Sequence, residues 1–256
     1  MLGLTGYPAG TRVGLWSEAK FKITNKNKNF DYTFDYIAMP VKKRTLSSAA
    51  ADCGMTVDVF VRIVSNSGYI MVTEAGTIWI EDFPYGVPTV IEIMTSSTSG
   101  SNKANGTTIA DAFEHAILGT PHTSPSINKR QVWARMVSQL IVKSEVGEQW
   151  GGKTLWILQD NLVDYICQST GLDVKLFATD QTSVVNIVSI GYGNAAAALS
   201  GVIELPDIQL YAGTVTPANT DEPSFSDIIC APMVPPLSSL FGLLAKKGAP
   251  LEYLTV

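Results

Sequence analysis

The stretch Tyr69–Gly119 is expected to decide the fold, and its sequence is YIMVTEAGTIWIEDFPYGVPTVIEIMTSSTSGSNKANGTTIADAFEHAILG. Its first half predicts three short β-strands bounded by turn residues: Tyr69–Glu74, Thr77–Phe83 and Thr89–Met94. A loop rich in Ser, Thr, Gly and Asn follows, and the apolar spacing after Thr107 predicts an amphipathic helix that ends at Gly119. Strands and a helix are therefore expected to pack in one unit here.

Glu92 is the most informative residue of this stretch, because it lies between Ile91 and Ile93 in a strand expected to be buried on both faces. An ionised carboxylate there costs several kcal/mol unless it is paired, hydrogen-bonded or bound to a metal ion. Glu81 and Asp82 end the preceding strand, and antiparallel pairing would bring them beside Glu92. Hard divalent cations prefer such oxygen ligands. The alternative is a structural carboxylate paired with a core cation or with backbone amides.

Regular patterns on both sides of this stretch predict an α/β fold with a mixed central sheet and flanking helices. A period of 3.6 residues predicts helices over Ser47–Val64 and Asn128–Trp150. An apolar run over Lys153–Gln159 predicts a buried strand, which is followed by an expected helix over Asn161–Ser169 and a strand over Val184–Ser189.

The chain of 256 residues is long enough for one large domain, and a single domain over 1–256 is expected. Three regions are predicted within it: an N-terminal basic β-hairpin region over 1–46, a catalytic α/β core over 47–190, and a C-terminal tail over 191–256. The hairpin strands are expected over Lys20–Thr24 and Phe30–Met39, and a docking helix is expected over Leu237–Leu244.

Charge is distributed unevenly along the chain, whose net charge is −5. Between Arg12 and Arg44, eight basic residues stand against three acidic ones, which gives +5 there and −10 elsewhere. Such asymmetry indicates a surface for a polyanion, and a basic two-stranded ribbon fits a DNA groove. A solvated edge hairpin is the alternative. Three cysteines without metal-ligand spacing favour a reducing cytoplasm, and the sequence has no apolar run of membrane-spanning length.

Other cations and hydroxyls are candidates for contacts to phosphates. Residues 42–44 are basic, the loop before residue 107 is rich in hydroxyls, and the first turns of helix 128–150 hold cations that oppose the helix dipole. The candidate DNA-binding residues are Lys42, Lys43, Arg44, Ser99, Lys129, Arg130 and Arg135. Structural salt bridges and an ordinary surface loop are the alternatives.

The order helix, three-strand meander, helix, strand, with acidic residues on the second and third strands, resembles the core of the PD-(D/E)XK nuclease superfamily. Three later stretches are similar to type II restriction endonucleases: INKRQVWARMVSQLIVKSE, GGKTLWILQD and FSDIICAPMVPP. The resemblance covers residues 47–160 in architecture and the C-terminal tail more loosely. A restriction-endonuclease-like core is therefore expected.

This resemblance implies a site made of Asp82, Glu92 and a lysine. Asp82 matches the metal-binding aspartate, assisted by Glu81, and Glu92 matches the glutamate of the E-x-K half-motif. The motif's lysine position is Met94, so Lys103 is expected to supply the lysine. The alternatives left open are Glu74 or Glu81 in place of Asp82, Glu114 as a further member, a motif in another register, and loss of catalysis.

The expected function is Mg²⁺-dependent hydrolysis of phosphodiester bonds in double-stranded DNA at a specific site, as in a type II restriction enzyme. A palindromic site implies a homodimer, and the resemblance implies a cytoplasmic protein that is prokaryotic or phage-encoded. P-loop, G-x-S-x-G and H-E-x-x-H motifs are absent from the sequence. Two alternatives are kept: a non-catalytic structural or assembly protein with acidic strand residues in ion pairs, which Met94 favours, and a metal-dependent hydrolase of a small phosphorylated substrate.

Overall fold

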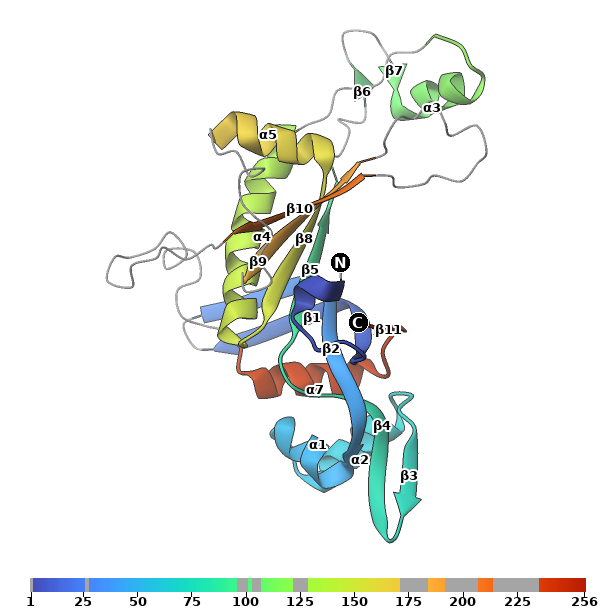
Figure 1. Ribbon diagram of the computed structural model, residues 1–256, viewed down its shortest axis with the longest axis vertical. Helices are drawn as coiled ribbons and strands as arrows, with labels where there is room; N and C mark the ends of the chain where they lie inside the picture. Colours follow the sequence, from blue (N-terminus) through green and yellow to red (C-terminus); the bar gives the residue numbers. More distant parts are fainter. Residues whose placement is uncertain are drawn as a thin grey trace, which may run out of the picture.

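The computed structural model describes residues 2–25, 28–95, 101–102, 107–121, 129–170, 184–191, 207–213 and 235–256. Within these ranges, nine strands form one mixed sheet, and seven of them follow the order β10–β9–β8–β5–β2–β1–β11 (Figure 1). β4 also pairs with β2, and β3 pairs with β4. The predicted α/β class with a mixed sheet and flanking helices is therefore confirmed.

The strands of this sheet are β1 (Arg12–Asn25), β2 (Lys28–Thr45), β3 (Met71–Glu74), β4 (Thr77–Pro84), β5 (Thr89–Met94), β8 (Lys153–Gln159), β9 (Val185–Gly191), β10 (Asp207–Gly213) and β11 (Glu252–Thr255). A separate small pair is formed by β6 (Ser101–Asn102) and β7 (Thr107–Thr108). The helices are η1 (Leu2–Thr5), α1 (Leu46–Asp52), α2 (Val57–Ser65), α3 (Ile109–Ile117), α4 (Lys129–Gln149), α5 (Asp160–Thr170) and α7 (Leu237–Lys247).

β2 lies inside the sheet, between β1 and β5, so the alternative of a solvated edge hairpin is wrong. Both hairpin strands are longer than predicted. Phe21 and Phe34 alternate with exposed residues and pack with Trp150 at ring-centroid distances of 5.5 and 5.7 Å. The buried aromatic side chains on one face of β1 and β2 hold these strands in the core, because burial of large aromatic side chains contributes strongly to packing.

The sequence predicts that β5 continues a meander with β3 and β4, but β5 does not pair with either strand. β4 pairs with the end of β2, where Lys42 lies opposite Phe83, whereas β5 pairs further back, where Ile37 lies opposite Val90. β4 and β5 therefore follow one another along the same edge of β2. The other edge of β5 pairs with β8 in parallel, and the chain between these two parallel strands includes α4.

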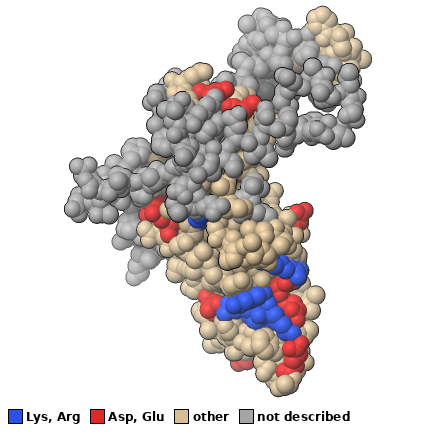
Figure 2. Space-filling model, in the orientation of Figure 1, with Lys and Arg blue, Asp and Glu red and all other residues tan. Residues whose placement is uncertain are grey.

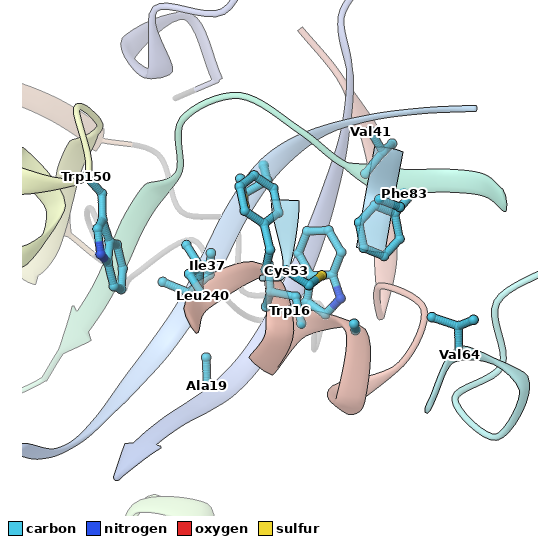
Figure 3. Close-up of a cluster of buried hydrophobic side chains, with 14 of the residues drawn as sticks. Trp16, Ala19, Ile37, Val41, Cys53, Val64, Phe83, Trp150 and Leu240 are labelled. Atoms are coloured by element: carbon cyan, nitrogen blue, oxygen red, sulfur yellow. The ribbon is translucent and has the colours of Figure 1, made fainter. Parts of the chain in front are cut away.

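α4 covers the sheet by packing against β5 and β8. Its buried residues Val142 and Val146 join the largest hydrophobic cluster, which also includes residues of β1, β2, α1, α2 and α7. Figure 3 shows part of this cluster, where Trp16 and Ile37 from the sheet lie near Leu240 of α7. The C-terminal region is thus part of the core, since β11 also pairs with β1.

The helix predicted over Ser47–Val64 is in fact two helices, α1 and α2. Gly54 lies at the break with φ +64°, a backbone conformation that glycine adopts readily. Thr45 caps α1 by accepting a hydrogen bond from the Ser48 amide at 3.3 Å. Among the helices in the described ranges, none combines the length and the apolar character needed to cross a membrane.

The backbones that precede β5 and β8 lie close together, and this close approach leads to a first prediction. A Cβ at Gly152 would lie 1.9 Å from the Pro88 carbonyl oxygen, so Gly152→Ala must displace backbone at the point where these strands begin. We expect the substitution to lower the free energy of unfolding by about 3 kcal/mol, measured by urea denaturation. Gly3→Ala is the control, because a Cβ at that position would have no atom within 4 Å. Equal stability of both variants would contradict the packing described here.

Candidate active site at Asp35, Glu92 and Lys143

Glu92 lies in β5 on the side that faces α4, and its side chain is 1% exposed. Its carboxylate Oε2 forms an ion pair with Nζ of Lys143 in α4, which is also buried. A buried charge of this kind is tolerated because the opposite charge compensates for lost hydration. The ion pair therefore joins the central sheet to the helix that covers it.

Asp35 of β2 is the second carboxylate at this site. The β2–β5 ladder pairs Tyr36 with Ile91. Because the two strands are antiparallel, Asp35, which precedes Tyr36, lies alongside Glu92, which follows Ile91. The Asp35 amide donates to Glu92 Oε1 at 3.3 Å, and the Ile93 amide donates to Asp35 Oδ2 at 2.9 Å. The two acidic residues are thus fixed relative to one another by reciprocal hydrogen bonds to backbone amides.

Burial is the main influence on the charge state of Glu92. Burial raises the pKa of the carboxyl, the Lys143 ammonium opposes this rise, and the nearby charge of Asp35 adds to it, so that the pKa changes from 4.5 to about 7. A carboxyl with a pKa near neutrality exchanges a proton in the physiological range. Such perturbed groups are often found at functional sites.

Asp82 is far from this site, so the expected metal site shared by Asp82 and Glu92 is wrong. Asp82 precedes Phe83, which lies opposite Lys42 on β2, whereas Glu92 lies beside Asp35. Seven residues of strand separate these positions, a distance of about 23 Å at 3.3 Å per residue. Ligands of one cation lie about 2–2.6 Å from it. Asp82 instead pairs with Arg12 at 2.9 Å.

The other acidic candidates do not join Glu92 either. Glu81 and Glu74 both pair with Lys43, at 3.1 and 2.5 Å. Glu114 is exposed on α3. Among the residues that the structure describes, no three His, Cys, Asp or Glu side chains gather in a group suited to a metal ion. Lys103 and Ser99 lie outside the described residues.

Two of the three cations predicted at residues 42–44 are already neutralised. Lys43 is shared by its two glutamates, and Arg44 pairs with Asp52. Lys42 lies over the ring of Tyr85 with its Nζ 4.2 Å from the centroid. Figure 2 shows the mixture on the surface, where blue and red side chains adjoin in the lower half of the view. For Lys129, Arg130 and Arg135, only the helical backbone is described.

Sequence reasoning missed Asp35 and Lys143. Lys143 carried a usable signal, because it lies three residues from both Leu140 and Val146 and so falls on the apolar side of α4. A lysine there must find a buried partner, and Glu92 was already identified as a carboxylate in need of one. Asp35 gave no comparable signal, since it lies in a segment with many polar and charged residues.

The buried ion pair leads to a prediction about stability. Lys143→Met leaves the Glu92 charge without its partner, so we expect the free energy of unfolding to fall by about 3–5 kcal/mol in urea denaturation at pH 8. The double variant Glu92→Gln, Lys143→Met should recover much of this loss, because no buried charge remains. Lys246→Met, at an exposed lysine, is the control and should change stability by about 0.5 kcal/mol or less. Additive losses in the double variant would count against the pair.

The pKa of Glu92 predicts a pH dependence. Because the folded protein holds this proton more tightly than the unfolded chain, Glu92 stabilises the fold fully below about pH 4.5, and that contribution is lost as pH rises through about 7. We therefore expect wild-type protein to lose on the order of 3 kcal/mol relative to Glu92→Gln between pH 4.5 and pH 8. Urea denaturation across this range measures the difference, and a difference that does not change with pH would refute the assignment.

Comparison with known proteins gives no family assignment. No protein-family model matches the chain, and no curated protein matches it. Function is therefore inferred from the geometry of Asp35, Glu92 and Lys143 together with the sequence resemblance described above.

Proposed function

We propose that this protein is a Mg²⁺-dependent endonuclease that hydrolyses phosphodiester bonds of double-stranded DNA, with Asp35, Glu92 and Lys143 as its catalytic residues. The observation that carries the proposal is their convergence: two carboxylates and one ammonium group meet from β2, β5 and α4. These are the groups that the resemblance to PD-(D/E)XK nucleases implies. Glu92 is the glutamate expected from the sequence, whereas Asp35 and Lys143 stand in place of the expected Asp82 and Lys103.

The arrangement of elements supports the same assignment. β1, β2 and β5 form three successive antiparallel strands, and the chain then continues through α4 to β8. Acidic residues lie on the second and third of these strands, as the resemblance requires, but 57 residues separate Asp35 and Glu92 in sequence. The intervening chain forms α1, α2, β3 and β4. We therefore infer a restriction-endonuclease-like core in this register.

The donor set suits Mg²⁺, which usually binds through one or two carboxylates and completes its coordination with waters and substrate phosphates. Asp35 and Glu92 supply the two carboxylates, and reciprocal amide hydrogen bonds hold them in place. When bound, the ion would lower the pKa of a coordinated water and stabilise charge on the phosphate. Glu92 must lose its proton to act as a ligand, and its pKa of about 7 allows this above neutral pH.

Lys143 takes the role that Met94 leaves vacant. Its ammonium is held at the Glu92 carboxylate and so lies beside the proposed site of reaction. A positive charge in this position stabilises negative charge that develops on the phosphate and fixes the Glu92 side chain in one orientation. The proposal also keeps a homodimer acting at a specific, palindromic site, because a duplex with such a sequence favours twofold symmetry.

A structural protein without catalytic activity is the second candidate function. The observation that favours it is the burial of the ion pair, since Glu92 and Lys143 are 1% and 3% exposed. Their charges compensate one another without any external ion. On this alternative, Glu92 and Lys143 serve only to hold α4 on the sheet, and the protein is a subunit of a larger assembly.

Incubation with phage-length duplex DNA separates the two functions. We expect wild-type protein with Mg²⁺ to give discrete fragments, and EDTA to prevent their formation. Asp35→Asn and Glu92→Gln should each lower the cleavage rate by at least about 100-fold, because each removes one charged ligand of the metal. Asp82→Asn is the matched control, since Asp82 is an acidic strand residue remote from the site, and it should cleave normally.

Intact DNA under all conditions with folded wild-type protein would contradict the nuclease and favour the structural role. Normal cleavage by Glu92→Gln would show that any nuclease site lies elsewhere. Circular dichroism of each variant at the assay temperature is the control that distinguishes loss of catalysis from unfolding.

A further inference from the structure

β1 and β2 extend past β5 as a two-stranded ribbon with two different faces. β5 pairs with β2 over Tyr36–Ala38, and the part of β2 that precedes these residues pairs with β1. Phe21 and Phe34 point into the core, whereas the exposed residues alternate with them. Two exposed cross-strand pairs result: Lys20 lies opposite Thr33 and Lys22 lies opposite Asp31. We name this surface, formed by Lys20, Lys22, Asp31 and Thr33, the ribbon face.

The two lysines of the ribbon face are available to an anion. Their side chains are 62% and 68% exposed, and they share one carboxylate, that of Asp31, at 3.8 and 4.0 Å. Exposed ion pairs of this length contribute little, so a phosphate can replace Asp31 as the partner at small cost. Lys43 and Arg44 differ, because carboxylates closer to them already balance their charges.

The ribbon face begins two residues along β2 from Asp35, on the side of the strands opposite to α4. Thr33, opposite Lys20, precedes Asp35 by two residues on the same strand, which corresponds to about 7 Å. Lys22 lies about 7 Å further along the ribbon. Lys20 and Lys22 therefore extend a line of positive charge along the strand pair from the position of Asp35.

We propose that the ribbon face binds the sugar–phosphate backbone of duplex DNA and places the duplex at Asp35, the half-exposed carboxylate of the site. This inference rests on the proposed function and adds the surface that holds the substrate. Lys43 and Arg44 are not part of that surface, because carboxylates pair with both. Contacts to phosphates carry no sequence information, so the ribbon face supplies affinity and orientation, whereas recognition of bases requires other groups.

Salt-dependent binding of a labelled duplex, measured in EDTA so that no cleavage occurs, tests the ribbon face. Removal of one lysine that binds a phosphate reduces the slope of log K against log salt by about 0.9. We therefore expect Lys20→Ala, Lys22→Ala to reduce the slope by about 2 and to weaken binding by roughly tenfold near 150 mM salt. The matched control is Arg62→Ala, Lys246→Ala, which removes the same charge from two exposed cations elsewhere and should bind like wild type.

A second variant predicts the opposite effect. Asp31→Asn removes the carboxylate that competes with phosphate for Lys20 and Lys22, so it should tighten DNA binding several-fold. If the double lysine variant binds DNA with wild-type affinity and salt dependence, the DNA-binding role of the ribbon face is wrong, and the proposed nuclease function is unaffected. Absence of DNA binding by folded wild-type protein would instead overturn the proposed function and this inference with it.

Discussion

The ion pair between Glu92 and Lys143 is the interaction on which the central part of this structure depends. It connects β5 to α4, and α4 belongs to the connection between the parallel strands β5 and β8. Neither charge is stable alone in the core, because removal from water costs several kcal/mol for each ion. The position of α4 on the sheet and the orientation of the Glu92 carboxylate are therefore set together.

Asp35 extends this arrangement from a structural pair to a candidate site. It holds Glu92 through its own backbone amide, and its carboxylate accepts the amide of Ile93. The charge of Asp35 raises the cost of ionising the buried Glu92, and the lysine offsets that cost only in part. A divalent cation offsets it further. The same cluster that stabilises the fold thus has the charge pattern of a metal-dependent hydrolase.

Local patterns predicted many of the elements. The strand Lys153–Gln159 is observed with the predicted bounds, and the long helix differs from the prediction by one residue at each end. The unusual character of Glu92 was also visible from its apolar neighbours. These features depend on residues close together in sequence, where periodicity and composition carry the information.

The partners of Glu92 were not predictable in the same way, because they depend on which strands and helices meet. Sequence order favours pairing of Thr89–Met94 with the preceding strand, since consecutive strands usually lie side by side. The chain instead returns to β2, and that choice brings Asp35 beside Glu92 and leaves Asp82 about 23 Å away along the strand. One topological difference therefore accounts for the wrong metal site.

The proposed function requires that Asp35 and Glu92 jointly bind a divalent cation. The most direct test is a crystal structure of the protein grown at pH 8 with Mn²⁺ in place of Mg²⁺, in which the anomalous signal locates the metal. We expect an ion bound directly to carboxylate oxygens of both residues, with Lys143 still adjacent to Glu92. A structure in which Mn²⁺ binds elsewhere, while Glu92 remains bonded only to Lys143 and the Asp35 amide, would contradict it.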